Sequence, residues 1–250
     1  MKTQTSIGNI KVYITADYKA MSQKAARIMQ GQIMLKPNSV LGLATGSTPI
    51  CLYDCLAEWH KAGELDFSAI RSVNLDEYQG LSGDSDQSYR FFMNKNLFSR
   101  VNIDVKKTYV PDGLAPDAAT ECARYDALIE SLGGVDMQLL GLGRNGHIGF
   151  NEPAETFSVG TQRTALTEST IDANKRFFAS EKDVPRFAFS MGIGTIMKAR
   201  KILLAASGKD KAEAVRGMIA GGVTPKLPAS ILQFHPDVSV VLDTDAASLL

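Results

Sequence analysis

The 250-residue sequence has no apolar run long enough to cross a membrane, for which a helix needs about 20 consecutive apolar residues. The N-terminal segment MKTQTSIGNIKVYITADY also lacks the apolar stretch of a secretion signal. We therefore expect a cytoplasmic protein without a membrane partner.

An excess of charge of either sign is absent too, because 27 Lys and Arg residues balance 27 Asp and Glu residues. A balanced chain offers no broad electrostatic surface to nucleic acid or to an anionic membrane. The sequence therefore predicts no nucleic-acid partner, and any anion that binds must be held by a local cluster.

Cysteine and histidine are scarce, with three residues of each. Cys51 and Cys55 lie four residues apart on an expected helix and Cys122 is remote from both, so no paired metal-binding spacing is present. We interpret the cysteines as packing residues and predict neither a metal site nor a disulfide.

Apolar runs typical of strands alternate with helical patterns along the chain. We expect strands at residues 11–15, 39–45, 72–75, 107–111, 135–143, 161–167, 201–207 and 238–242, and helices at 17–35, 48–62, 88–98, 116–132, 193–199 and 209–220. Strands that are apolar on both faces and separated by helices indicate a parallel sheet covered on both sides. Without a repeat or a long linker, residues 1–250 are predicted to form one doubly wound, mostly parallel α/β domain.

Polar motifs follow three of these strands: TGSTP (45–49), DEY (76–78) and GRNGHIGFNEP (143–153). In an open α/β sheet, ligands bind beyond the carboxyl ends of the strands. The three motifs therefore predict one site at this edge of the sheet.

The TGSTP motif joins a strand to a helix. Its glycine, hydroxyls and amide groups at a helix N-terminus suit a phosphate, without need of net charge. The alternative is an ordinary helix start in which Ser47 or Thr48 caps a helix begun by Pro49. No Gly-Lys-Ser/Thr follows, so the motif is not a P-loop.

Asp76 and Glu77 stand where a buried strand is expected to end. Two neighbouring acids repel each other unless one faces solvent or a ligand. Asp76 is therefore a candidate general base whose pKa is set by partial burial. The alternative is a solvated carboxylate in a turn.

The third motif contains His147, the type of side chain that titrates nearest neutrality. Glu152 can orient the imidazole, and Asn145 can donate or accept without titrating. The alternative is a structural histidine in a loop. The motif has no neighbouring cysteine and the chain has no Gly-x-Ser-x-Gly segment, so a covalent acyl-enzyme is not indicated.

Cations of later motifs could complete a phosphate site. Arg176 lies in ANKRFF, while Lys209 and Lys211 lie in SGKDKA after an apolar strand. Taken singly, each is more typical of a solvated surface charge.

Together, the segments LGLATGSTP, NLDEYQGL, GLGRNGHIGFNEP, ANKRFF and SGKDKA resemble in order and spacing those of the glucosamine-6-phosphate deaminases. The resemblance runs from about residue 35 to 240, and NGHIGFNEP is its most specific part. It implies an open α/β sheet of modified Rossmann type. It also implies conversion of glucosamine 6-phosphate and water to fructose 6-phosphate and ammonia without a cofactor, a step of amino-sugar metabolism.

The resemblance implies roles for single residues. Asp76 matches the base that moves a proton between C2 and C1 of the sugar. His147 matches the residue that assists ring opening, and Glu152 and Asn145 match its partners. Many members have Asp at the position of Asn145, so this neutral group bears on the pH profile. The residues that match the phosphate site are Thr45, Gly46, Ser47, Thr48, Arg176 and Lys211, whereas Lys209 has no clear match.

Two other functions fit parts of the pattern. A 6-phosphogluconolactonase has a similar fold and a glycine-rich histidine loop, but NEP after that loop and DEY at 76–78 argue against it. A sugar-phosphate-binding regulator would carry a helix-turn-helix domain, for which this chain has neither room nor a basic patch.

Regulation is expected to be absent. Longer relatives that N-acetylglucosamine 6-phosphate activates are hexamers and bind its phosphate with an Arg and a Lys shortly after NEP. An ungapped alignment puts Gln162 and Thr164 at those positions, and Arg163 between them points to the opposite face of a strand. We therefore expect a monomer, or at most a small oligomer, without allosteric activation.

Overall fold

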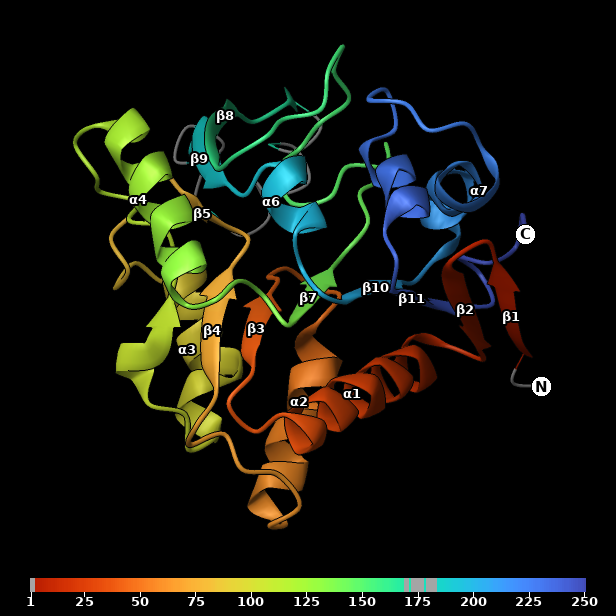
Figure 1. Cartoon of the computed structure of the whole chain (residues 1–250), viewed down its shortest axis with the longest axis horizontal. Coiled ribbons are helices and arrows are strands. Elements are labelled where there is room, and N and C mark those ends of the chain that lie inside the picture. Colours follow the sequence, from red (N-terminus) through yellow and green to blue (C-terminus); the bar gives the residue numbers. More distant parts are fainter. Residues whose placement is uncertain (1–2, 169–170, 172–177, 179–183) are drawn as a thin grey trace.

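The computed structural model describes residues 3–168, 171, 178 and 184–250. Its larger sheet has eight strands in the order β1-β2-β11-β10-β7-β3-β4-β6 (Figure 1). Strand β1 pairs antiparallel with β2, and every other pairing in this sheet is parallel. In sheet order, the bounds are Thr3–Ile7, Ile10–Thr15, Val238–Asp243, Ile202–Ala206, Met137–Leu140, Val40–Leu43, Arg71–Asn74 and Thr108–Tyr109. The predicted mostly parallel α/β fold is confirmed.

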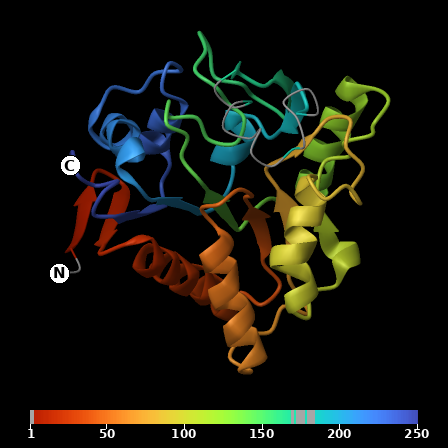
Figure 2. The same cartoon turned by 180° about the vertical axis from the view of Figure 1, so that it is seen from behind.

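Helices lie on both sides of this sheet. Figure 1 shows α1 (Tyr18–Leu35) and α2 (Ile50–Lys61) below the strands, and α6 (Ile193–Met197) and α7 (Ala212–Ala220) above them. Helices α3 (Tyr89–Asn96) and α4 (Ala118–Ser131) lie near β4 and are seen from behind in Figure 2. Short 3₁₀ helices are η1 (Phe98–Arg100), η2 (Val105–Lys107), η5 (Lys209–Lys211) and η6 (Pro228–Phe234). No helix of the described residues is long and apolar enough to cross a membrane.

Local signals set the starts of three helices. Asp17, Ser88 and Asp117 precede α1, α3 and α4, and the side chain of each accepts a hydrogen bond from a backbone N–H of the first turn. Such caps satisfy N–H groups that have no partner inside the helix. The helices therefore begin within about two residues of the positions that the sequence predicts.

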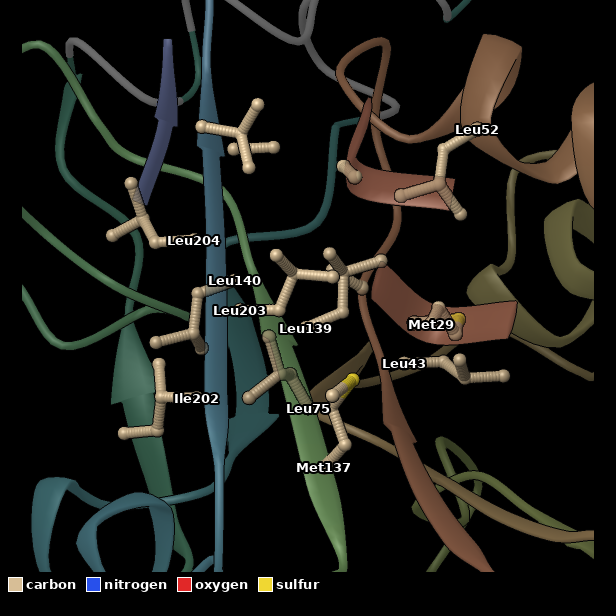
Figure 3. Close-up of a cluster of buried hydrophobic side chains, with 14 of the residues drawn as sticks. Met29, Leu43, Leu52, Leu75, Met137, Leu139, Leu140, Ile202, Leu203 and Leu204 are labelled. Atoms are coloured by element: carbon tan, nitrogen blue, oxygen red, sulfur yellow. The ribbon is translucent and has the colours of Figure 1, made fainter. Parts of the chain in front are cut away.

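The core lies where β7 and β10 run side by side. These strands are buried along their whole length, and Leu139 pairs with Leu203 in the parallel register. Figure 3 shows these leucines in one cluster with Leu43 and Met29. Burial of apolar side chains from both faces of the central strands holds the helices against the sheet, which makes the strand ends a firm base for the site.

A second sheet was not expected from the sequence. Strands β5 (Asp76–Tyr78), β9 (Phe187–Ser190) and β8 (Gln162–Ala165) form an antiparallel sheet in the order β5-β9-β8. The chain passes into it at Leu75, whose N–H donates to Leu43 O and whose carbonyl accepts from Met191 N. The DEY motif is therefore a strand, not a turn, and the small sheet positions Asp76.

Candidate active site

The predicted motifs lie at one edge of the large sheet. Strands β3, β7 and β10 are parallel, and the TGSTP loop, the loop 143–153 and η5 follow their carboxyl ends. Strand β5 continues from β4, the parallel neighbour of β3. The arrangement at this edge agrees with the sequence-based expectation, because carboxyl ends of parallel strands meet there.

Asp76 is buried, with only 6% of its surface exposed. Burial, with a smaller effect from the neighbouring Glu77, raises its pKa to about 8. Among the described residues, no donor forms a hydrogen bond with its carboxyl group. A buried carboxyl without donors favours its neutral form, so the alternative of a solvated turn carboxylate is wrong.

Glu77 has a different role from Asp76, although burial raises its pKa as well. Its carboxylate accepts the N–H groups of Tyr78, Tyr89 and Arg90 at 2.8, 2.8 and 2.9 Å. Two of these donors belong to the first turn of α3. Because neighbouring side chains of a strand point to opposite faces, Glu77 holds a helix N-terminus while Asp76 faces away from it. The sequence did not reveal this division of roles.

The three polar residues of the His147 loop contact one another. His147 Nδ1 lies 3.2 Å from Glu152 Oε1, a contact that lacks the alignment of a hydrogen bond. Asn145 Nδ2 donates to Glu152 Oε2 at 2.6 Å, and His147 N donates to Asn145 Oδ1 at 3.2 Å. Glu152 therefore lies between the imidazole and the amide, an arrangement that can orient the imidazole.

Two glycines of this loop allow its close contacts. A side chain at residue 143 would have its Cβ 2.5 Å from the His147 ring, so only glycine fits beneath the imidazole. Gly149 has a φ of +56°, and a Cβ there would lie 3.9 Å from Asp76 Oδ2. The backbone at Gly149 therefore brings the His147 loop next to the Asp76 carboxyl.

The TGSTP loop lacks the cap that its alternative interpretation requires. The N-cap of α2 is Pro49, with no side-chain hydrogen bond, and Gly46 has a φ of +86°. The carbonyl oxygens of Ser47 and Thr48 accept from Tyr18 Oη at 2.9 and 3.2 Å. Within the described residues, the hydroxyls of Ser47 and Thr48 have no hydrogen bond of their own. Hydroxyls and amide groups at the start of a helix suit an anion.

The cations are placed differently. Lys211, the last residue of η5, is 21% exposed, and burial lowers its pKa, whereas Lys209 is exposed. Arg176 lies outside the described residues, as do most of its neighbours.

Asp243 of β11 accepts hydrogen bonds from the hydroxyl of Ser207 and the N–H of Gly208, just before η5. The sequence did not indicate that Asp243 holds this turn.

The arrangement suits proton transfer on an anionic substrate. It combines a buried carboxyl with a raised pKa, an imidazole next to a carboxylate, and a loop that offers donors to an anion. Over the described part of the chain, no three His, Cys, Asp or Glu side chains form a group that could hold a metal ion, and all three cysteines are free thiols.

Comparisons with known proteins agree with the fold. The family model of glucosamine-6-phosphate isomerases and 6-phosphogluconolactonases matches residues 16–241. The glucosamine-6-phosphate deaminase of Clostridium perfringens is 56% identical over 96% of this chain and 100% of its own. That of Thermoanaerobacter pseudethanolicus is 54% identical over 96% of this chain and 95% of its own.

Solved structures resemble the whole chain. A monomeric glucosamine-6-phosphate deaminase superposes with a TM-score of 0.93 and 48% identity, over 96% of this chain and 99% of that one. The 6-phosphogluconolactonase of Trypanosoma brucei has a TM-score of 0.74 and 21% identity, over 96% and 98% of the two chains. The second likeness concerns the fold alone.

Proposed function

The chain belongs to the glucosamine-6-phosphate isomerase/6-phosphogluconolactonase family, and we propose that it converts glucosamine 6-phosphate and water to fructose 6-phosphate and ammonia. The observation that carries this proposal is the buried Asp76 carboxyl beside the loop in which Glu152 contacts both His147 and Asn145. The full-length similarity to named deaminases supports it.

Ring opening is the first step. A proton must leave the anomeric hydroxyl, and one must reach the ring oxygen. His147 can carry this proton, because an imidazole has one nitrogen that can accept a proton and one that can donate it. The Glu152 carboxylate, 3.2 Å from Nδ1, stabilises the charged imidazole and fixes the ring orientation. Asn145 holds the other Glu152 oxygen and keeps the carboxylate in place.

Isomerisation and deamination follow in the open-chain sugar. Asp76 takes the proton from C2, which the neighbouring aldehyde makes acidic, and returns it to C1, while the aldehyde oxygen gains a proton and the amino group loses one. The product is a 2-imine, which adds water at C2 and releases ammonia. A base with a pKa near the working pH is effective in both directions of proton transfer, and burial raises the Asp76 pKa to about 8.

Phosphate binding would orient the sugar for these steps. Residues 45–48 offer hydroxyl and amide donors, and Lys211 supplies a half-buried cation at the same edge of the sheet. Arg176 is proposed as a further cation from the resemblance. Interactions with this remote group contribute binding energy that positions the reacting carbons.

The direct test is ammonia release by the purified protein from glucosamine 6-phosphate, measured beside hydrolysis of 6-phosphogluconolactone. Ammonia and fructose 6-phosphate in equal amounts are expected, with no catalysed lactone hydrolysis. Lactonase activity without ammonia release would refute the proposal. Binding of the sugar phosphate without turnover would instead indicate a regulator.

We further propose that residues 1–250 act as one domain and as a monomer without allosteric activation. Gln162 donates to Asn151, and Thr164 has no charge. Arg163 on the opposite face of β8 lies over the Phe187 ring and donates to Gln79. Gln162 and Thr164 therefore supply no cation for an effector phosphate, and the guanidinium of Arg163 is held on the other face of the strand. The cytoplasmic location expected from the sequence, like the role in amino-sugar metabolism, stays a prediction.

A further inference from the structure

The side chain of Asn151 joins segments that come from different parts of the chain. It is buried, and its Nδ2 donates to Ile148 O and to Met191 O, both at 2.8 Å. Its Oδ1 accepts from Ser158 Oγ at 2.5 Å and from Gln162 Nε2 at 3.2 Å. These four hydrogen bonds, called the Asn151 network below, use the full capacity of the amide.

A second contact connects the same loop to the strands that carry Asp76. Phe150 N donates to Ser190 Oγ at 3.0 Å, and Ser190 lies opposite Asp76 in the β5–β9 pairing. A Cβ at Gly149 would lie 3.1 Å from that hydroxyl and 3.9 Å from Asp76 Oδ2. The loop backbone after His147 therefore rests on the strand pair that positions Asp76.

We propose that Asn151 is a positioning residue, which fixes the loop that carries His147 relative to the strand pair that carries Asp76. The inference rests on the proposed function, in which both groups must reach one sugar. Asn151 is not bonded to either of them, so the Asn151 network acts through Ile148 O on one side and Met191 O on the other. The four hydrogen bonds of the Asn151 network do not involve residues 45–48 or Lys211. Loss of the Asn151 side chain should therefore affect catalysis more than binding of the sugar phosphate.

The test is the Asn151→Ala variant, which removes all four bonds. Because a misplacement of about 1 Å costs about 100-fold in rate, we expect kcat to fall by about 10- to 100-fold, with KM within about threefold of the wild type. The matched control is Gln32→Ala. Gln32 is also a buried amide, bonded to Ser39 and Lys201 at the opposite edge of the sheet, and its loss should leave kcat unchanged.

An NMR measurement without substrate tests the positioning by itself. The chain has only three histidines, so their imidazole signals can be resolved, and His147→Gln identifies the signal of His147. Asn151→Ala should move that signal and leave those of His60 and His235 in place. Gln32→Ala should leave the His147 signal in place. A wild-type protein without deaminase activity would contradict the proposed function, whereas this spectrum would still decide the role of Asn151.

An Asn151→Ala variant with wild-type kcat and an unmoved His147 signal would overturn the inference. A variant that loses kcat and raises KM alike would overturn it too, because that result indicates general damage. If the Asn151→Ala variant does not fold, the Ser190→Ala variant tests the inference instead. Of the hydrogen bonds made by this loop, it removes only the one that Phe150 N donates to Ser190 Oγ. A loss of about 3- to 10-fold in kcat at unchanged KM would then support the inference, and wild-type kcat would contradict it.

Discussion

Replacement of Asp76 by Asn removes the proposed base with almost no change of shape. The carboxyl group of Asp76 makes no hydrogen bond with any described residue, so the amide disrupts no side-chain hydrogen bond of the described structure. A general base contributes about 10²- to 10⁴-fold to a rate, and Glu77, whose carboxylate is bonded to three backbone N–H groups, is not placed to replace it. We expect turnover to fall by about that factor, while KM for glucosamine 6-phosphate stays close to the wild-type value.

The same substitution should stabilise the protein at high pH. Burial raises the pKa of Asp76 from 3.8 to about 8. One pKa unit corresponds to about 1.4 kcal/mol, so ionising this buried carboxyl costs up to about 6 kcal/mol more than ionising it in the unfolded chain. Between these two pKa values the folded state binds more protons than the unfolded state, so wild-type stability falls as the pH rises. The Asp76→Asn variant avoids this loss, because an amide does not titrate in this range.

Two measurements test this reasoning together. The first is the rate of ammonia release from pH 6 to 9.5. The wild-type kcat/KM should decline below about pH 8, because the pH dependence of kcat/KM reports the pKa of the base in the free enzyme. Denaturant unfolding should give a variant several kcal/mol more stable than the wild type at pH 9 and of nearly equal stability at pH 4. Near wild-type turnover would remove Asp76 from the mechanism. An equal stability difference at both pH values would show that the carboxyl is not buried as described.

Three further outcomes are expected. His147→Gln should slow turnover of the closed-ring sugar more than solvent exchange of the C2 proton in the open-chain form; unaffected exchange and turnover would make this histidine structural. Lys211→Ala and Arg176→Ala should each weaken binding of the 6-phosphate sugar by about 1.5–3 kcal/mol, and equal losses on unphosphorylated glucosamine would place these cations away from the phosphate. Velocity should depend hyperbolically on substrate with and without N-acetylglucosamine 6-phosphate, at a monomeric mass by light scattering; a sigmoidal curve that this compound makes hyperbolic would reveal an effector site.

The sequence alone determined the strands of the central sheet except β1, most helices and the edge at which the candidate site lies. Local patterns carry this information, because buried parallel strands are continuously apolar and helices have a 3.6-residue period. Residues 135–143 predicted β7 (Met137–Leu140), and residues 17–35 predicted α1. The contact of Glu152 with His147 and Asn145 also follows from short spacing, since the three residues share one loop.

Tertiary structure decided the surroundings of these residues. In the small sheet, residues 76–78 pair with 188–190, and residues 162–165 pair with 187–190. No local pattern in three- and four-residue strands reveals such distant partners. That pairing buries Asp76, turns Glu77 toward the start of α3 and places Ser190 beneath the His147 loop. The residue types at the site are local properties of the chain, whereas burial and pKa depend on segments that only folding brings together.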